Sequence, residues 1–124
     1  MMRKLAIAAV LGFAVGRNTL TSQKRVHVRL QNGTPWVVTN VTLTSPGNRL
    51  HADRLAPGAV SRYERQDGAF RYGALDLVAD NVRRRLTPID YDGEVSLPPG
   101  DYTYVILYAP VMRDGVFLQL QRDR

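Results

Sequence analysis

An acidic segment in the second half of the chain carries three carboxylates at alternate positions. Asp90, Asp92 and Glu94 alternate with Tyr91 and Gly93. Calcium takes several oxygen ligands and a glycine allows the sharp turn of a calcium loop, so the segment resembles part of such a site. The glutamate that closes a complete loop is absent at the expected spacing. We therefore expect Asp90 to accept backbone hydrogen bonds in a turn and Glu94 to pair with an arginine. A metal site of Asp90, Asp92 and Glu94 is the alternative.

Arg71 is the arginine expected to meet these acids. It stands between Phe70 and Tyr72 in a segment that should be a central strand. An unpaired buried charge is too costly to persist, so Arg71 should either point outward or pair with a carboxylate. We expect it to pair with Asp90 or Glu94 and to hold their loop against the domain, a structural role that competes with calcium for the same oxygens.

Aromatic residues offer a second kind of site. Trp36, Tyr72 and Tyr91 come from separate segments and would form a stacking platform for a sugar ring if the fold brought them together. The other reading is that they pack in the core. We keep Trp36, Tyr72 and Tyr91 as the candidate binding residues for a protein or glycan partner.

Several chemistries have no residues to carry them. The chain has no cysteine, which removes disulfides, thiolate nucleophiles and thiolate metal sites. It has neither a Gly-x-Ser-x-Gly turn nor a glycine-rich phosphate loop, and its two histidines, His27 and His51, are expected to be solvated or lightly packed. We expect no enzyme, no catalytic residue and no cofactor.

The basic residues do not point to nucleic acid. The formal charge is +6, and the only basic run is Arg83, Arg84 and Arg85. On a strand Arg83 and Arg85 share one face while Arg84 takes the other, where we expect it to need a carboxylate partner. A surface that binds phosphates would need more converging charge and interleaved aromatic residues. We therefore expect the run to be a solvated face.

The first residues have the pattern of a secretory signal. Arg3 and Lys4 precede an apolar run over residues 5–15, and small residues end at Gly16. The run is too short to span a bilayer, which needs about 20 residues. The sequence predicts a signal peptide over residues 1–16, a flexible leader over 17–24 and one domain over 25–124. Export to the periplasm or outside the cell follows, with membrane contact only through an uncleaved signal.

From residue 25 onward the hydrophobic period is two, and turn residues separate short apolar segments. The spacing predicts an all-β domain: an antiparallel β-sandwich of about seven or eight strands, with an immunoglobulin-like or prealbumin-like Greek key. Residues 36–44 should place Val37, Thr39, Val41 and Leu43 on one face. Residues 49–55 and 60–65 should be edge strands, and residues 70–79 a central one. The side chains expected to be buried are Val28, Val41, Leu43, Leu77, Val105, Leu107 and Leu118.

Three segments carry a family resemblance. Residues 70–73, 88–94 and 99–104, read in order as Phe-Arg-Tyr-Gly, Pro-Ile-Asp-Tyr-Asp-Gly-Glu and Pro-Gly-Asp-Tyr-Thr-Tyr, look like a group of small exported bacterial domains. Many members are lipoproteins, whereas this chain has Arg17 where the lipid-bearing cysteine would stand. The resemblance implies a β-sandwich in the cell envelope and no particular activity. Tyr102, which enters a late strand after Gly100, also resembles the tyrosine corner of Greek-key sandwiches.

These observations favour a non-catalytic exported domain that binds a protein or glycan partner of the cell envelope through its loops or an exposed sheet face. The alternative is a calcium-dependent or enzymatic protein centred on Asp90 to Glu94.

Overall fold

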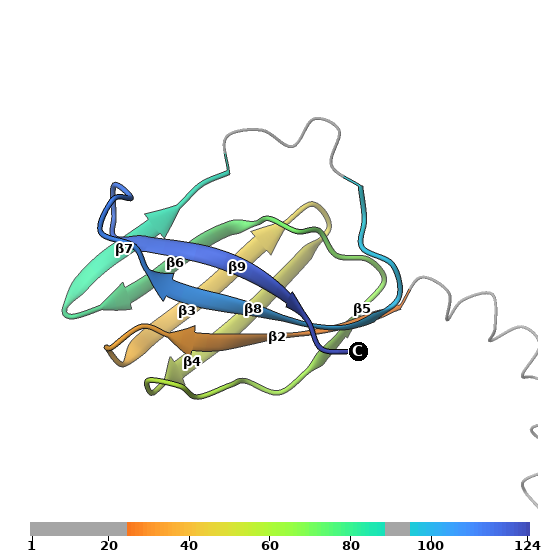
Figure 1. Cartoon of the computed structure of the whole chain (residues 1–124), viewed down its shortest axis with the longest axis horizontal. Coiled ribbons are helices and arrows are strands. Elements are labelled where there is room, and N and C mark those ends of the chain that lie inside the picture. Colours follow the sequence, from red (N-terminus) through yellow and green to blue (C-terminus); the bar gives the residue numbers. More distant parts are fainter. Residues whose placement is uncertain (1–24, 89–94) are drawn as a thin grey trace, which may run out of the picture.

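The computed structural model describes residues 25–88 and 95–124, which form strands and no helix. Within these residues eight strands make two four-stranded sheets, which pack face to face (Figure 1). The first sheet has the order β5 (Glu64–Gln66), β2 (Val26–Gly33), β8 (Gly100–Tyr108) and β9 (Val116–Arg122). The second has the order β4 (Asn48–Leu55), β3 (Val38–Ser45), β6 (Ala74–Ala79) and β7 (Val82–Leu86). The predicted β-sandwich is confirmed, and no described segment is a helix that could cross a membrane.

The strand order distinguishes the two expected topologies. All neighbouring strands are antiparallel except β2 and β8, which run parallel with Val26 opposite Gly100 and Gly33 opposite Leu107. Strands β2 and β3 follow one another in the chain but lie in different sheets, whereas an immunoglobulin domain keeps its first two strands in one sheet. The order therefore departs from the immunoglobulin one and leaves the prealbumin-like alternative. Strand β4 lies at a sheet edge, as predicted for residues 49–55, and β5, at an edge of the other sheet, covers only the end of the strand predicted over residues 60–65.

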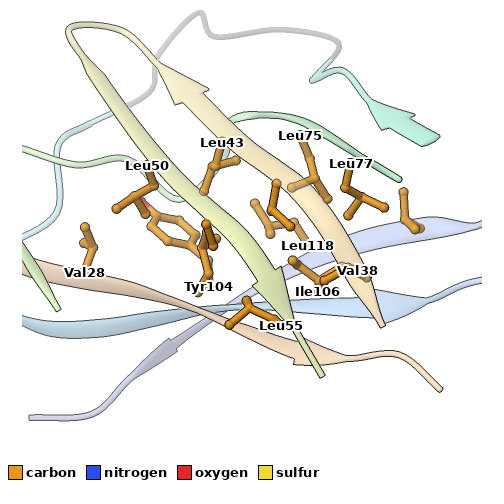
Figure 2. Packing of buried hydrophobic residues seen from close by; sticks show 14 of the residues in the cluster. Val28, Val38, Leu43, Leu50, Leu55, Leu75, Leu77, Tyr104, Ile106 and Leu118 are labelled. Atoms are coloured by element: carbon orange, nitrogen blue, oxygen red, sulfur yellow. The ribbon is translucent and has the colours of Figure 1, made fainter. Parts of the chain in front are cut away.

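The core lies between the two sheets, where apolar side chains from both layers point toward each other (Figure 2). Burying each such side chain contributes about 1.5–3 kcal/mol, and the chain has no cysteine to supplement this packing with disulfides. Five of the seven residues predicted to be buried are buried: Val28, Val41, Leu43, Leu77 and Leu118.

The prediction for the face of β3 was wrong at its start. Val37 is 38% exposed and Val38 is fully buried, although Val41 and Leu43 face the core as expected. The cause is Asn40, whose φ of 50° lies in the left-handed region and coincides with a shift of register against β6. This bulge inserts one extra residue, so the side chains before it change face. Asparagine is among the few residue types that adopt this conformation readily.

The prediction for β8 was also wrong. Tyr104 and Ile106 face the core, while Val105 and Leu107 are only half-buried on the outer face of the sheet. Both faces of this strand are apolar in sequence, so the alternation alone does not say which one is inside. The pairing decides it, because Ile106 stands opposite Leu118 on the inner side of β9. The Tyr104 hydroxyl reaches the edge of the core and donates to the Phe70 carbonyl.

The segment before β6 is irregular, so the expected strand over residues 70–79 begins only at Ala74. Arg71 is exposed in this segment and does not lie in a central strand. Gly73 lets this segment pass close to Leu43 and Thr44 of β3. A Cβ atom on Gly73 would lie 2.7 Å from Leu43 Cδ1 and 3.0 Å from the Thr44 carbonyl oxygen.

Tyr102 anchors the start of β8 in the core. Tyr102 is 2% exposed, and its hydroxyl donates a hydrogen bond of 2.7 Å to the Pro98 carbonyl oxygen, four residues upstream. This is the geometry expected of a tyrosine corner.

Tyr102→Phe removes this hydrogen bond and leaves the ring in place. We expect the free energy of unfolding to fall by about 1 kcal/mol, the net contribution of one hydrogen bond, measured by urea denaturation. Tyr108→Phe is the control, because the Tyr108 hydroxyl makes no hydrogen bond to the described residues. Equal midpoints for wild-type protein and Tyr102→Phe would contradict a stabilising corner.

Candidate binding groove

Of the residues predicted to form sites, the described part of the chain includes Trp36, Arg71, Tyr72 and Tyr102. Asp90, Tyr91, Asp92 and Glu94, and with them the calcium alternative and the pairing of Arg71, lie outside the described residues. The signal and leader over residues 1–24 lie outside them too. Within residues 25–88 and 95–124 no three acidic or histidine side chains come together as a possible metal site.

Trp36 lies in the link between β2 and β3, and its ring contacts two other side chains of the domain. Tyr108 packs edge-on against it, with ring centroids 5.1 Å apart at an interplanar angle of 80°. The Arg84 guanidinium lies over it, with Cζ 4.5 Å from the ring centroid. Such a contact stabilises the arginine by cation–π attraction. A sugar ring stacking on that face would have to displace Arg84.

Asn32 fixes the link that carries Trp36. Its side chain is fully buried, and Nδ2 donates to the carbonyl oxygens of Trp36, at 2.6 Å, and Leu55, at 2.9 Å. Oδ1 accepts from the Thr34 amide, at 2.9 Å, and from the Thr34 hydroxyl, at 2.7 Å. Both donors and both acceptor sites of the amide are therefore used.

Arg84 connects Trp36 to the loop between β8 and β9. We expected it to need a carboxylate, but its Nη1 donates to the Asp114 carbonyl oxygen at 3.0 Å and its Nε to the Ala79 carbonyl oxygen at 3.2 Å. The Asp114 carboxylate accepts from the Arg85 amide at 2.8 Å. Backbone carbonyls and an aromatic face thus replace the ion pair, and the loop is attached to the edge of β7.

Arg83 and Arg85 project from the other face of β7, as predicted, and meet one acid. Asp76 on β6 pairs with Arg83 Nη2 at 2.7 Å and with Arg85 Nε at 3.3 Å. The hydrogen bond from Arg83, with the charges of both arginines, lowers the pKa of Asp76. All three side chains are substantially exposed, so this cluster is a solvated one of small energetic weight.

An apolar groove opens where the edges of β7 and β9 meet, on the side of the sandwich where the two strands lie together in Figure 1. We call it the β7–β9 groove. Its volume is about 340 Å³, within the range of ligand pockets. Its walls include Tyr72, Leu86, Pro88, Met112, Phe117 and Leu118. Tyr72 is 46% exposed and Phe117 41% exposed. Two aromatic residues at the rim of the groove are therefore accessible to solvent.

Two more hollows adjoin the β7–β9 groove and share Met112 with it. Their volumes are about 520 and 310 Å³, and both are lined by Arg113 and Asp114. Arg85 lines the larger one, beside Val116. The apolar groove therefore continues along β7 into a more polar, arginine-rich surface.

A separate polar cluster lies on the outer face of the sheet that contains β2 and β8. Asp123 Oδ2 accepts from the Tyr63 hydroxyl and from the Thr103 hydroxyl, both at 2.6 Å. Arg29 Nε donates to Thr103 Oγ1 at 2.9 Å, and its guanidinium lies 4.5 Å from the Tyr63 ring centroid. These contacts occupy the Asp123 carboxylate, so the cluster ties the last residues of the chain to the sheet.

The charges of this cluster are set by its hydrogen bonds. Burial would raise the pKa of Asp123, but hydrogen bonds from Thr103, Tyr63 and Gln121 and the charge of Arg29 together lower it. The hydrogen bond to Asp123, with burial, raises the pKa of Tyr63. At neutral pH the Asp123 carboxylate therefore accepts a hydrogen bond from a neutral Tyr63 phenol.

Sequence reasoning identified Tyr72 but missed Phe117, Met112 and the Asp123 cluster. Phe117 and Met112 read as ordinary strand and loop residues, and Tyr63 and Asp123 are separated by 60 positions. No local pattern connects these residues, because they meet only through the strand order.

Comparison with known proteins supports the fold and adds no function. No family model matches the chain, and no curated protein matches it. A solved NMR structure of a protein from Eubacterium rectale resembles it, with a TM-score of 0.52 and 13% sequence identity, over 82% of this chain and 90% of that one. At this identity the likeness concerns the sandwich architecture alone.

The Asp123 cluster makes a pH-dependent contribution to stability. The pKa of the Asp123 carboxyl group is lower in the folded protein than in the unfolded chain. The stability that the carboxylate contributes is therefore complete above the unfolded pKa of about 3.9 and is lost as pH falls through the folded pKa. We expect Asp123→Asn to lower the free energy of unfolding by roughly 1–3 kcal/mol near pH 7, and the difference from wild type to shrink near pH 3. Urea midpoints at both pH values measure this.

Asp67→Asn is the matched control, since the exposed Asp67 makes no hydrogen bond or ion pair with the described residues. A difference between wild type and Asp123→Asn that stays constant with pH would show that the carboxylate charge is not what stabilises the cluster.

Proposed function

We propose that this chain is an exported, non-catalytic binding domain whose β7–β9 groove receives an apolar side chain of a protein partner. The observation that carries the proposal is the pair of half-exposed aromatic rings, Tyr72 and Phe117, above an apolar floor. Covering such rings removes a large apolar area from water. Export rests on the signal pattern of residues 1–16.

A protein partner fits the groove better than a glycan does. Sugar hydroxyls need several side-chain hydrogen-bond partners, and among the residues that line the groove Thr87 and Tyr72 alone offer hydroxyl groups. Aliphatic walls such as Leu86, Met112 and Leu118 suit an aliphatic or aromatic side chain instead. Trp36, the residue best suited to stacking on a sugar, is covered by Arg84 outside the groove.

The affinity available from the groove alone is small. Burying one apolar side chain contributes about 1.5–3 kcal/mol, and the loss of translational and rotational freedom on association opposes it. A partner must therefore make further contacts outside the groove, along the strands that form its rim.

The proposal predicts that a random peptide library displayed on phage yields peptides with an apolar anchor residue when selected on the purified protein. Phe117→Glu should raise the dissociation constant of the selected peptides by at least about tenfold, measured by fluorescence titration. Val60→Glu is the control, because Val60 is equally exposed, at 43%, but lies away from the groove.

Two results would contradict the proposal. One is a selection that gives no enriched peptide, and the other is a set of peptides that bind Phe117→Glu as well as wild type. Binding to a glycan array that is lost in Phe117→Glu would replace the protein partner with a glycan at the same groove.

A further inference from the structure

The free edge of β9 runs beside the β7–β9 groove. Strand β9 is paired with β8 on one side and with no strand of the described residues on the other. The Ala109 amide bonds to the Gly115 carbonyl oxygen, and the Asp123 amide to the Asp101 carbonyl oxygen. In an antiparallel pair the residues that bond to the neighbour alternate with those that do not. The backbone groups of Leu118 and Leu120 therefore point away from β8, toward the free edge.

The other edges of the sandwich are less suited to receive a strand. At β7 the outward amide of Arg85 is already bonded to the Asp114 carboxylate, and the loop lies along that edge. Strand β5 has three residues. Strand β4 exposes the charged side chains of Arg49, Asp53 and Arg54, a common protection against edge pairing. Only at β9 does an open edge adjoin an apolar groove in the described structure.

The groove reaches around this edge. Phe117 on the outer face of β9 and Leu118 on its inner face both line it. A chain that paired with β9 would alternate its side chains between the same two faces. One of its residues would then enter the groove between Leu118 and Leu86, in contact with the core.

Charge indicates the composition of such a chain. Arg113 is exposed in the loop before β9. Arg122 is exposed at the end of the strand, where its guanidinium donates to the carbonyl oxygens of Pro99 and Arg124 but pairs with no carboxylate of the described residues. The Asp114 carboxylate is directed toward β7, where it accepts a hydrogen bond from the Arg85 amide. Acidic residues beside the apolar anchor would complement the arginines at the two ends of the edge.

Resting on the proposed function, we infer that the partner is an extended acidic protein segment that adds to the sheet as a strand along β9 and places an apolar side chain in the β7–β9 groove. Main-chain hydrogen bonds to Leu118 and Leu120 supply the affinity that the groove alone lacks, and the pocket and the arginines supply the selectivity.

Amide hydrogen exchange followed by NMR tests this inference, with a peptide from the selection that depends on Phe117 as the probe. Saturating peptide should slow exchange of the Leu118 and Leu120 amides by at least about tenfold, because they would become hydrogen-bonded. The Gln119 and Gln121 amides, which point toward β8, serve as internal controls and should change little.

A second arm replaces each Asp and Glu of that peptide with Asn and Gln, which should weaken binding and reduce its dependence on salt. A Phe117-dependent peptide that leaves the Leu118 and Leu120 amides unprotected overturns strand addition and leaves the proposed function standing. Binding unaffected by the amide replacements overturns the acidic partner. A selection without any Phe117-dependent peptide overturns both the inference and the proposed function.

Discussion

The buried amide of Asn32 is the interaction on which this end of the domain depends. Its side chain is inaccessible to solvent and bonds to three different places in the chain: Thr34, Trp36 and Leu55. Its backbone bonds to the next loop as well, since the Asn32 amide donates to the Ala59 carbonyl oxygen and the Gly58 amide to the Asn32 carbonyl oxygen. Leaving such groups without partners costs about 1–3 kcal/mol each, so one side chain holds the end of β2, the end of β4 and the link to β3 in a fixed arrangement.

The groove depends on this arrangement through a short series of contacts. Asn32 positions the backbone of Trp36, and the Trp36 ring receives Arg84 and Tyr108. Arg84 and the neighbouring Arg85 amide hold Asp114. Met112, two residues earlier in the same loop, is shared by all three hollows. A series of contacts thus connects the buried amide of Asn32 to the loop that lines the groove, although Asn32 itself does not line it.

The sequence predicted what depends on alternation and turns, and failed where tertiary pairing decides. Val41, Leu43 and Leu77 were placed correctly because their strands are apolar on one face. Val37 was misplaced because the bulge at Asn40 reverses the alternation. Val105 and Leu107 were misplaced because both faces of β8 are apolar, and only its register with β9 selects the inner one. Among the residues that line the groove, the sequence identified Tyr72 as a candidate binding residue. Phe117 becomes a site residue only because β7 and β9 meet at one side of the sandwich.

Trp36 is the only tryptophan of the chain, so its fluorescence emission under native conditions tests the role of Asn32 most directly. Asn32→Asp keeps the size of the side chain but replaces Nδ2, which donates both hydrogen bonds, with one oxygen atom that faces the carbonyl oxygens of Trp36 and Leu55. If Asn32 holds the link, the Trp36 ring of the Asn32→Asp protein should lose its contacts with Arg84 and Tyr108. Its emission maximum should then move to longer wavelength than that of wild type. A folded Asn32→Asp protein with the emission spectrum of wild type would contradict the dependence of this end of the domain on Asn32.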